Sequence, residues 1–134
     1  MNYIELTNEY NKFMDSSGIR QFCTDKCIPH CCSHPTCTFK TCKKSLGCIS
    51  FICYILIDWI FSKEEQKEWT KMHNKVLDKI LWFNKDFPFN SSFRHYSPGM
   101  DAFEFDDKDF QFLFKLNKQN FKIRKDIKPI TFIL

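Results

Sequence analysis

Glycine is scarce in this sequence, and the motifs that depend on glycine are missing with it. The chain has 3 glycines among 134 residues, and no stretch matches the glycine-rich loop that cradles phosphates. The His-Glu-x-x-His and Gly-x-Ser-x-Gly motifs are also missing, and the acidic stretch Asp101–Asp109 lacks the spacing and glycine of an EF-hand. The sequence therefore selects no catalytic residue, and we favour a non-enzymatic function.

Long apolar runs are missing as well. The most apolar stretch, CISFICYILIDWIF at residues 48–61, is shorter than the roughly 20 residues that span a bilayer, and Asp58 interrupts it. We expect a buried core helix there, with an interfacial segment as the alternative. Residues 1–15 show no basic region followed by an apolar run, so we expect no signal peptide, no transmembrane segment and a cytoplasmic protein.

Aromatic residues, in contrast, are abundant, at 17% of the chain with 16 phenylalanines. This composition excludes a disordered chain, and the length fits one domain. The net charge of +4 and the pI of about 8.6 neither require nor exclude nucleic acid. We interpret a basic run near the C-terminus as solvated surface, with an anionic partner such as nucleic acid as the alternative. This run consists of Lys115, Lys118, Lys122, Arg124, Lys125 and Lys128.

Helical periodicity dominates the first two thirds of the chain. Apolar residues at Tyr3, Leu6, Tyr10 and Phe13 predict a helix over residues 3–14, and Asp15–Gly18 predicts its end. Residues 46–61 form an apolar, helical pattern.

Ser62 and Glu65 have the spacing of a capping box, so a long helix should begin there and run to about Phe83. Its apolar face comprises Trp69, Met72, Val76, Ile80 and Phe83, and its lysines, mostly on the other face, are Lys63, Lys67, Lys71, Lys75 and Lys79. His73 lies on the apolar side. We interpret it as a core histidine with a hydrogen-bond partner, and the alternative is a metal ligand.

Beyond residue 100, apolar residues recur at every second position instead of every third or fourth. The alternating residues are Phe103 with Phe105, then Phe110, Phe112, Phe114 and Leu116, then Phe121 with Ile123, and Ile130 with Phe132. This pattern predicts a small antiparallel β-meander with one aromatic face. We expect a single α+β domain over residues 1–134. Residues 1–45 provide a helix and a cysteine-rich region, residues 46–84 the core helices, and residues 100–134 the meander.

The most distinctive feature is a stretch of cysteines and histidines, which we call the Cys/His segment (residues 23–53). Its potential metal ligands are Cys23, Cys27, His30, Cys31, Cys32, His34, Cys37, Cys42, Cys48 and Cys53. Zinc takes four such ligands in a tetrahedron, so one site is easily supplied and two are possible. In a chain that is not exported, metal binding is favoured over disulfides.

The spacing within the segment suits chelation but matches no standard zinc finger. Short loops occur at Cys27-x-x-His30, Cys31-x-x-His34 and His34-x-x-Cys37. We group Cys23, Cys27, Cys31 and Cys32 as one ligand set and Cys37, Cys42, Cys48 and Cys53 as a second, with His30 and His34 as alternates. An iron–sulfur cluster, disulfides, reduced structural cysteines and a cysteine–histidine nucleophile remain alternatives. Cys53, inside the apolar stretch, is as well explained as a core residue.

One part of the segment resembles a known cysteine signature. The piece CTDKCIPHCC, from Cys23 to Cys32, is similar to the cysteine cluster of the YkgJ-type zinc- or iron-chelating proteins, although its spacing differs. The resemblance covers about ten residues and implies metal chelation alone. We expect a small zinc protein that acts as a binding or adaptor module for a protein or nucleic acid partner. The alternative is a metal-handling or redox protein with an iron–sulfur cluster.

Overall fold

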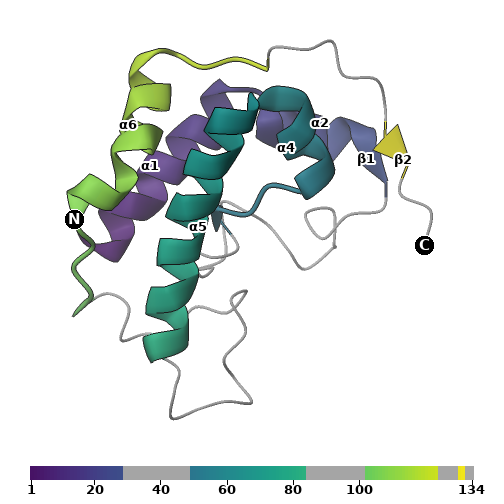
Figure 1. Cartoon of the computed structure of the whole chain (residues 1–134). Helices are drawn as coiled ribbons and strands as arrows, with labels where there is room; N and C mark the ends of the chain where they lie inside the picture. The colour runs from purple at the N-terminus through teal and green to yellow at the C-terminus, as the bar shows by residue number, and fades with distance from the viewer. Residues whose placement is uncertain (29–48, 84–101, 124–129, 132–134) are drawn as a thin grey trace.

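The computed structural model describes residues 1–28, 49–83, 102–123 and 130–131 (Figure 1). The elements in chain order are α1 (Tyr3–Ser16), α2 (Ile19–Lys26), β1 (Cys27–Ile28), α4 (Tyr54–Ile60), α5 (Lys63–Phe83), the 3-10 helix η4 (Asp107–Phe110), α6 (Gln111–Lys118) and β2 (Ile130–Thr131). Within these residues helices account for most of the structure. None of the described helices is both long and apolar enough to cross a membrane.

Helix α1 forms where its apolar periodicity predicts it. Its start is fixed by a capping box, in which the Glu5 backbone amide donates to Asn2 Oδ1 at 2.9 Å and the Asn2 amide donates to Glu5 Oε1 at 3.2 Å. The expected apolar face is buried in the core. The helix ends at Ser16, and Gly18 follows with a φ of 84°, a left-handed conformation that favours glycine.

Helix α5 confirms a second sequence prediction. The Ser62 amide donates to Glu65 Oε1 at 2.9 Å, and the Glu65 amide donates to Ser62 Oγ at 3.2 Å, so the expected capping box is present. Trp69, Met72 and Val76 are buried on one face, as the spacing predicts. The side chains of the other two expected core positions, at 80 and 83, lie outside the described part.

The apolar stretch before α5 is helical over a shorter range than expected. Residues 51–53 are irregular, and α4 begins at Tyr54 with Cys53 as its N-cap residue in an extended conformation. This break directs Ile52 and Leu56 into the core, where both are buried. Residues 46–48 lie outside the described part.

The expected β-meander over residues 100–134 is wrong, and the α+β class is wrong with it. The run from Phe110 to Leu116 belongs to η4 and α6 rather than to a strand. Residues 103–106 and 121–123 are irregular. Within the described residues the β structure is one short parallel pairing of β1 with β2, which matches Cys27 with Ile130 and Ile28 with Thr131.

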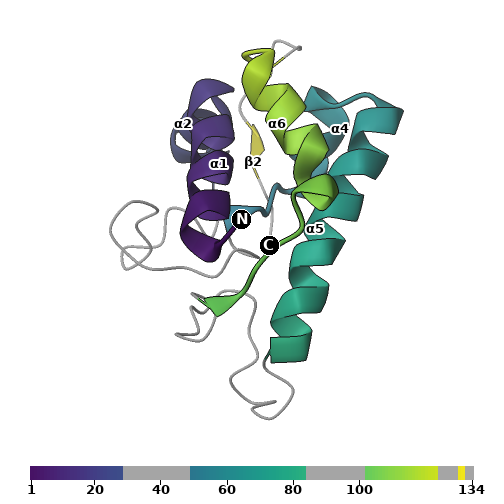
Figure 2. The same cartoon turned by 90° about the vertical axis from the view of Figure 1, so that its left-hand side faces the viewer.

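The position of α6 explains why its pattern predicted a strand. Helix α6 packs against both α1 and α5, and Figure 2 shows it lying between them. Leu113 and Leu116 are buried at helical spacing, while Phe112 and Phe114 are half-buried on the flanks. A helix enclosed on two sides carries apolar residues around most of its circumference, so alternate positions are apolar as well.

An aromatic cluster joins the helices at the centre of the core. The Phe13 ring of α1 lies 5.2 Å from the Trp69 ring of α5, 6.3 Å from Phe61 and 5.6 Å from Phe121, measured between centroids. Phe61 in turn lies 5.5 Å from both Trp69 and Phe121. We call Phe13, Phe61, Trp69 and Phe121 the aromatic cluster. Such pairs contribute about 0.5–1.5 kcal/mol each beyond the area that they bury.

The start of the chain is tied to the segment that enters η4. The Met1 ammonium donates to the Phe105 carbonyl at 2.8 Å, and the Phe105 amide donates to the Met1 carbonyl at 2.7 Å. Asp107 Oδ1 accepts from the ammonium at 3.0 Å, and this hydrogen bond raises the pKa of the α-amino group above its ordinary 8.0. Part of the acidic stretch at residues 101–109 therefore has a structural role.

The aromatic cluster leads to the first prediction. Phe13 is fully buried, so Phe13→Ala should lower the free energy of unfolding by about 3–5 kcal/mol, through lost burial and the cavity that remains. Urea unfolding followed by circular dichroism measures this. Ile4 on the same helix is 61% exposed, so Ile4→Ala should change stability by less than about 0.5 kcal/mol. Similar losses in the two variants would contradict the described core.

Candidate functional site

The structure describes the two ends of the Cys/His segment. Cys23 lies on α2, Cys53 caps α4, and the backbone of Cys27 forms part of β1. The remaining expected ligands lie outside the described residues: His30, Cys31, Cys32, His34, Cys37, Cys42 and Cys48.

Both end cysteines are anchored to the core. Cys23 and Cys53 are half-buried and pack against the hydrophobic cluster, and Cys53 is a free thiol. Within the described residues, no three cysteine, histidine or acidic side chains gather in a geometry that could hold a metal ion. Metal binding by the segment therefore stays a prediction from the sequence.

His73 of α5 has a hydrogen-bond partner that the sequence did not indicate. Its Nδ1 atom lies 2.7 Å from the hydroxyl oxygen of Ser50, which is completely buried. Phe51, which is 45% exposed, lies beside the imidazole with 6.3 Å between ring centroids. The expected hydrogen-bond partner of His73 is therefore present, while the histidine itself is half-buried at the edge of the core. A serine within an otherwise apolar stretch was the available signal for this pair.

The Ser50–His73 pair has the distance of a catalytic serine–histidine pair but not its accessibility. A nucleophilic serine must meet its substrate, and the Ser50 side chain has no exposed surface. Burial also lowers the pKa of His73 from its ordinary 6.5. The neutral imidazole is therefore favoured at neutral pH, and the pair acts as a buried polar contact between the segment before α4 and helix α5.

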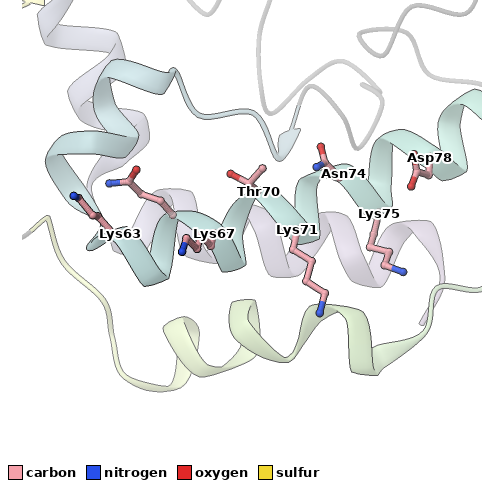
Figure 3. A pocket seen from close by; sticks show the side chains of 8 residues that line it. Lys63, Lys67, Thr70, Lys71, Asn74, Lys75 and Asp78 are labelled. Carbon is pink, nitrogen blue, oxygen red and sulfur yellow. The ribbon is translucent and has the colours of Figure 1, made fainter.

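A row of exposed lysines runs along α5. Four lysines at four-residue intervals, Lys63, Lys67, Lys71 and Lys75, are all exposed, and we call them the α5 basic face. They line a shallow depression of about 660 Å³, together with Gln66, Thr70, Asn74 and Asp78 (Figure 3). Their spacing predicts that these lysines lie mostly on the solvent side of the helix, but nothing in the sequence marks them as a site.

A second, smaller depression adjoins the first. It has a volume of about 220 Å³ and lies between α5 and the start of α6. Lys71 and Lys75 line both depressions, and Lys108 of η4 lines the smaller one. Glu68 and Asp109 also border it, so its charge is mixed. The basic surface is thus continuous from α5 toward η4, but its positive charge is concentrated on α5.

The structure describes three of the six residues of the basic run near the C-terminus. Lys115 and Lys118 are exposed in the last turn of α6, where cations interact favourably with the helix dipole. The Lys122 ammonium donates to the carbonyl oxygen of Ser16 at the end of α1. Arg124, Lys125 and Lys128 lie outside the described residues. Lys122 therefore has a local structural contact, and binding of an anionic partner by this run stays a prediction.

Comparison with known proteins identifies no relative. No protein-family model, curated protein or solved structure matches the chain. The similarity of Cys23–Cys32 to the YkgJ-type cluster therefore stays a prediction, and function has to be argued from the chain's own residues.

The half-buried His73 leads to the second prediction. Because the folded-state pKa of His73 is below the unfolded value of 6.5, the unfolded chain binds the proton first as the pH falls. The contribution of His73 to stability should be complete above pH 6.5 and decrease as the pH falls through the folded-state pKa. Urea unfolding at about pH 7.5 and about pH 5 should show a smaller loss in His73→Gln than in the wild type.

An NMR titration of the ring provides the control. The His73 imidazole should titrate below its ordinary value of 6.5 in the folded protein. A pKa at or above that value, or equal pH dependence of stability in His73→Gln and the wild type, would show that burial does not govern this group.

Proposed function

We propose that the protein is a small, non-enzymatic binding module in which the Cys/His segment holds zinc. The observation that supports this most directly is the concentration of ten potential soft or borderline ligands within residues 23–53, where one structural zinc site needs four. The cytoplasm is the compartment we propose, because a reducing environment keeps thiols available as ligands.

The described fold supports a structural role for such a metal. Cys23 on α2 and Cys53 at α4 lie at the two ends of the segment and pack against the same core. A metal bound between these ends would close the chain on itself. Structural zinc contributes about 10–16 kcal/mol of apparent binding free energy in small domains, an amount comparable to the whole stability of a typical domain.

A binding role is favoured over catalysis by the described titratable groups. The Ser50–His73 pair is the arrangement closest to a nucleophilic site, and its hydroxyl is buried. The exposed polar surface, in contrast, includes the four lysines of the α5 basic face. We therefore propose that the metal stabilises the fold and that the surface of the helices meets the partner.

The third prediction concerns metal content. Protein purified anaerobically should be colourless and contain at least one zinc ion per chain by elemental analysis, and thiol counting should find its cysteines reduced. Visible absorbance with stoichiometric iron would instead indicate the iron–sulfur alternative. Four disulfides with no metal, shown by mass spectrometry under non-reducing conditions, would overturn the proposal.

Cysteine variants locate the site. The double variant Cys27→Ser and Cys31→Ser should lose zinc, because it removes half of the first expected ligand set. The double variant Cys37→Ser and Cys42→Ser is the matched comparison, because it removes two members of the second expected ligand set and should leave a metal bound by the first set in place. Full zinc content in the Cys27→Ser and Cys31→Ser variant would exclude the first ligand set.

A further inference from the structure

We propose that the α5 basic face binds the phosphate backbone of double-stranded DNA. This inference deepens the proposed function, because it names the partner of the binding module and the surface that meets it. It uses described residues alone, and none of them belongs to the Cys/His segment.

The spacing of the lysines suits a linear polyanion. Four residues of α-helix rise about 6 Å, so the four lysines span about 18 Å along the helix axis. Double-stranded DNA carries one negative charge per roughly 1.7 Å of its axis, so a row of this length faces several phosphates. Figure 3 shows the labelled side chains projecting from one continuous helix, which fixes their relative positions.

The charge of the face is not compensated within the described structure. Among the described residues that line the depression, four are lysines and one, Asp78, is acidic. Glu64 and Glu68 are on the same helix, yet no ion pair joins them or Asp78 to these lysines in the described part of the chain. Like charges four residues apart on a helix repel one another and destabilise it. A bound polyanion would relieve this repulsion.

Hydrogen-bonding groups lie between the cations. Thr70 and Asn74 are exposed and line the same depression as the lysines. Threonine and asparagine side chains are common donors to phosphate oxygens in protein–DNA complexes. The amide of Gln66 donates to the Phe61 carbonyl at 3.2 Å, so it holds the start of α5 instead.

The same lining disfavours other anionic partners. Its described residues include no aromatic side chain, whereas proteins that bind single strands stack bases on aromatic rings. They include no large apolar side chain either, whereas membrane-surface helices insert such residues and protein interfaces bury them at their centre. Contact with the backbone of a duplex needs only cations and hydrogen-bond donors. The face has both.

The experiment measures binding of the full-length protein to a short mixed-sequence DNA duplex by fluorescence polarisation, over a range of salt concentrations. Four phosphate contacts predict a slope of about −3.6 for log affinity against log salt, which is about a 100-fold loss between 50 and 200 mM. The triple variant Lys67→Gln, Lys71→Gln and Lys75→Gln should flatten the slope by about 3. The triple variant Lys67→Arg, Lys71→Arg and Lys75→Arg keeps the positive charges, so it should bind the duplex with the wild-type slope.

A matched control removes the same charge elsewhere. The triple variant Lys12→Gln, Lys115→Gln and Lys118→Gln changes exposed lysines on α1 and α6, two of them from the basic run near the C-terminus. It should keep the wild-type slope if α5, and not that run, contacts the DNA. Circular dichroism checks that both triples retain their helices. Loss of binding in the control triple equal to that in the α5 triple, or no binding by the wild type at low salt, would overturn the proposal.

Further arms test the identity of the partner and separate this inference from the zinc proposal. Tighter binding to single-stranded DNA, duplex RNA, polyglutamate or anionic vesicles than to duplex DNA would overturn the assignment. Zinc content is measured on the same samples. Protein without zinc that still binds the duplex through α5 supports the DNA surface while the metal proposal fails. Zinc-loaded protein that does not bind overturns the DNA surface alone.

Discussion

Contact between the rings of Phe13, Phe61, Trp69 and Phe121 is the interaction on which the described fold depends. These residues come from α1, from the turn before α5, from α5 itself and from the segment after α6. Segments far apart in the sequence therefore meet in one cluster with centroid distances between 5.2 and 6.3 Å. Large rings bury much surface per residue, which suits a domain of this length.

The cluster also determines which surfaces are left for function. Trp69 and its buried neighbours hold one side of α5 against the core, so the opposite side of the helix projects its lysines into solvent. The capping box at Ser62 fixes where α5 begins and hence which residues occupy each side. The basic face is therefore a rigid feature whose lysines cannot shift relative to one another along the helix.

The helices with one apolar face, α1 and α5, could be predicted from the sequence. Helix α6, which is apolar on more than one face, could not. In α1 and α5 the apolar residues recur every three or four positions because one side alone is buried. Helix α6 lies between two other helices, so Phe112 and Phe114 meet apolar surroundings although they are off its most buried face. The hydrophobic periodicity of a sequence identifies a helix that is buried on one face. It gives the wrong prediction for a helix that is buried on two faces.

The candidate sites divide in a similar way. Local spacing revealed the cysteines and histidines as potential ligands, because chelation is largely a property of neighbouring residues. The Ser50–His73 contact joins positions 23 residues apart, and nothing in their spacing predicts it. The lysines of α5 were visible in the sequence, but surface lysines are common. Their interest comes from the depression that they share and from the lack of any ion pair between them and the other described residues.

In the proposed binding module, a bound metal and the α5 basic face would act through the same helix. The Cys/His segment begins on α2 and ends at α4, and α4 packs against α5. The Ser50–His73 contact fastens the end of the segment to the same helix, close to its buried side. A metal that orders the segment would therefore support α5 from the core side, while its lysines face outward. The stability of the fold and the position of the charged surface would then depend on the same helix.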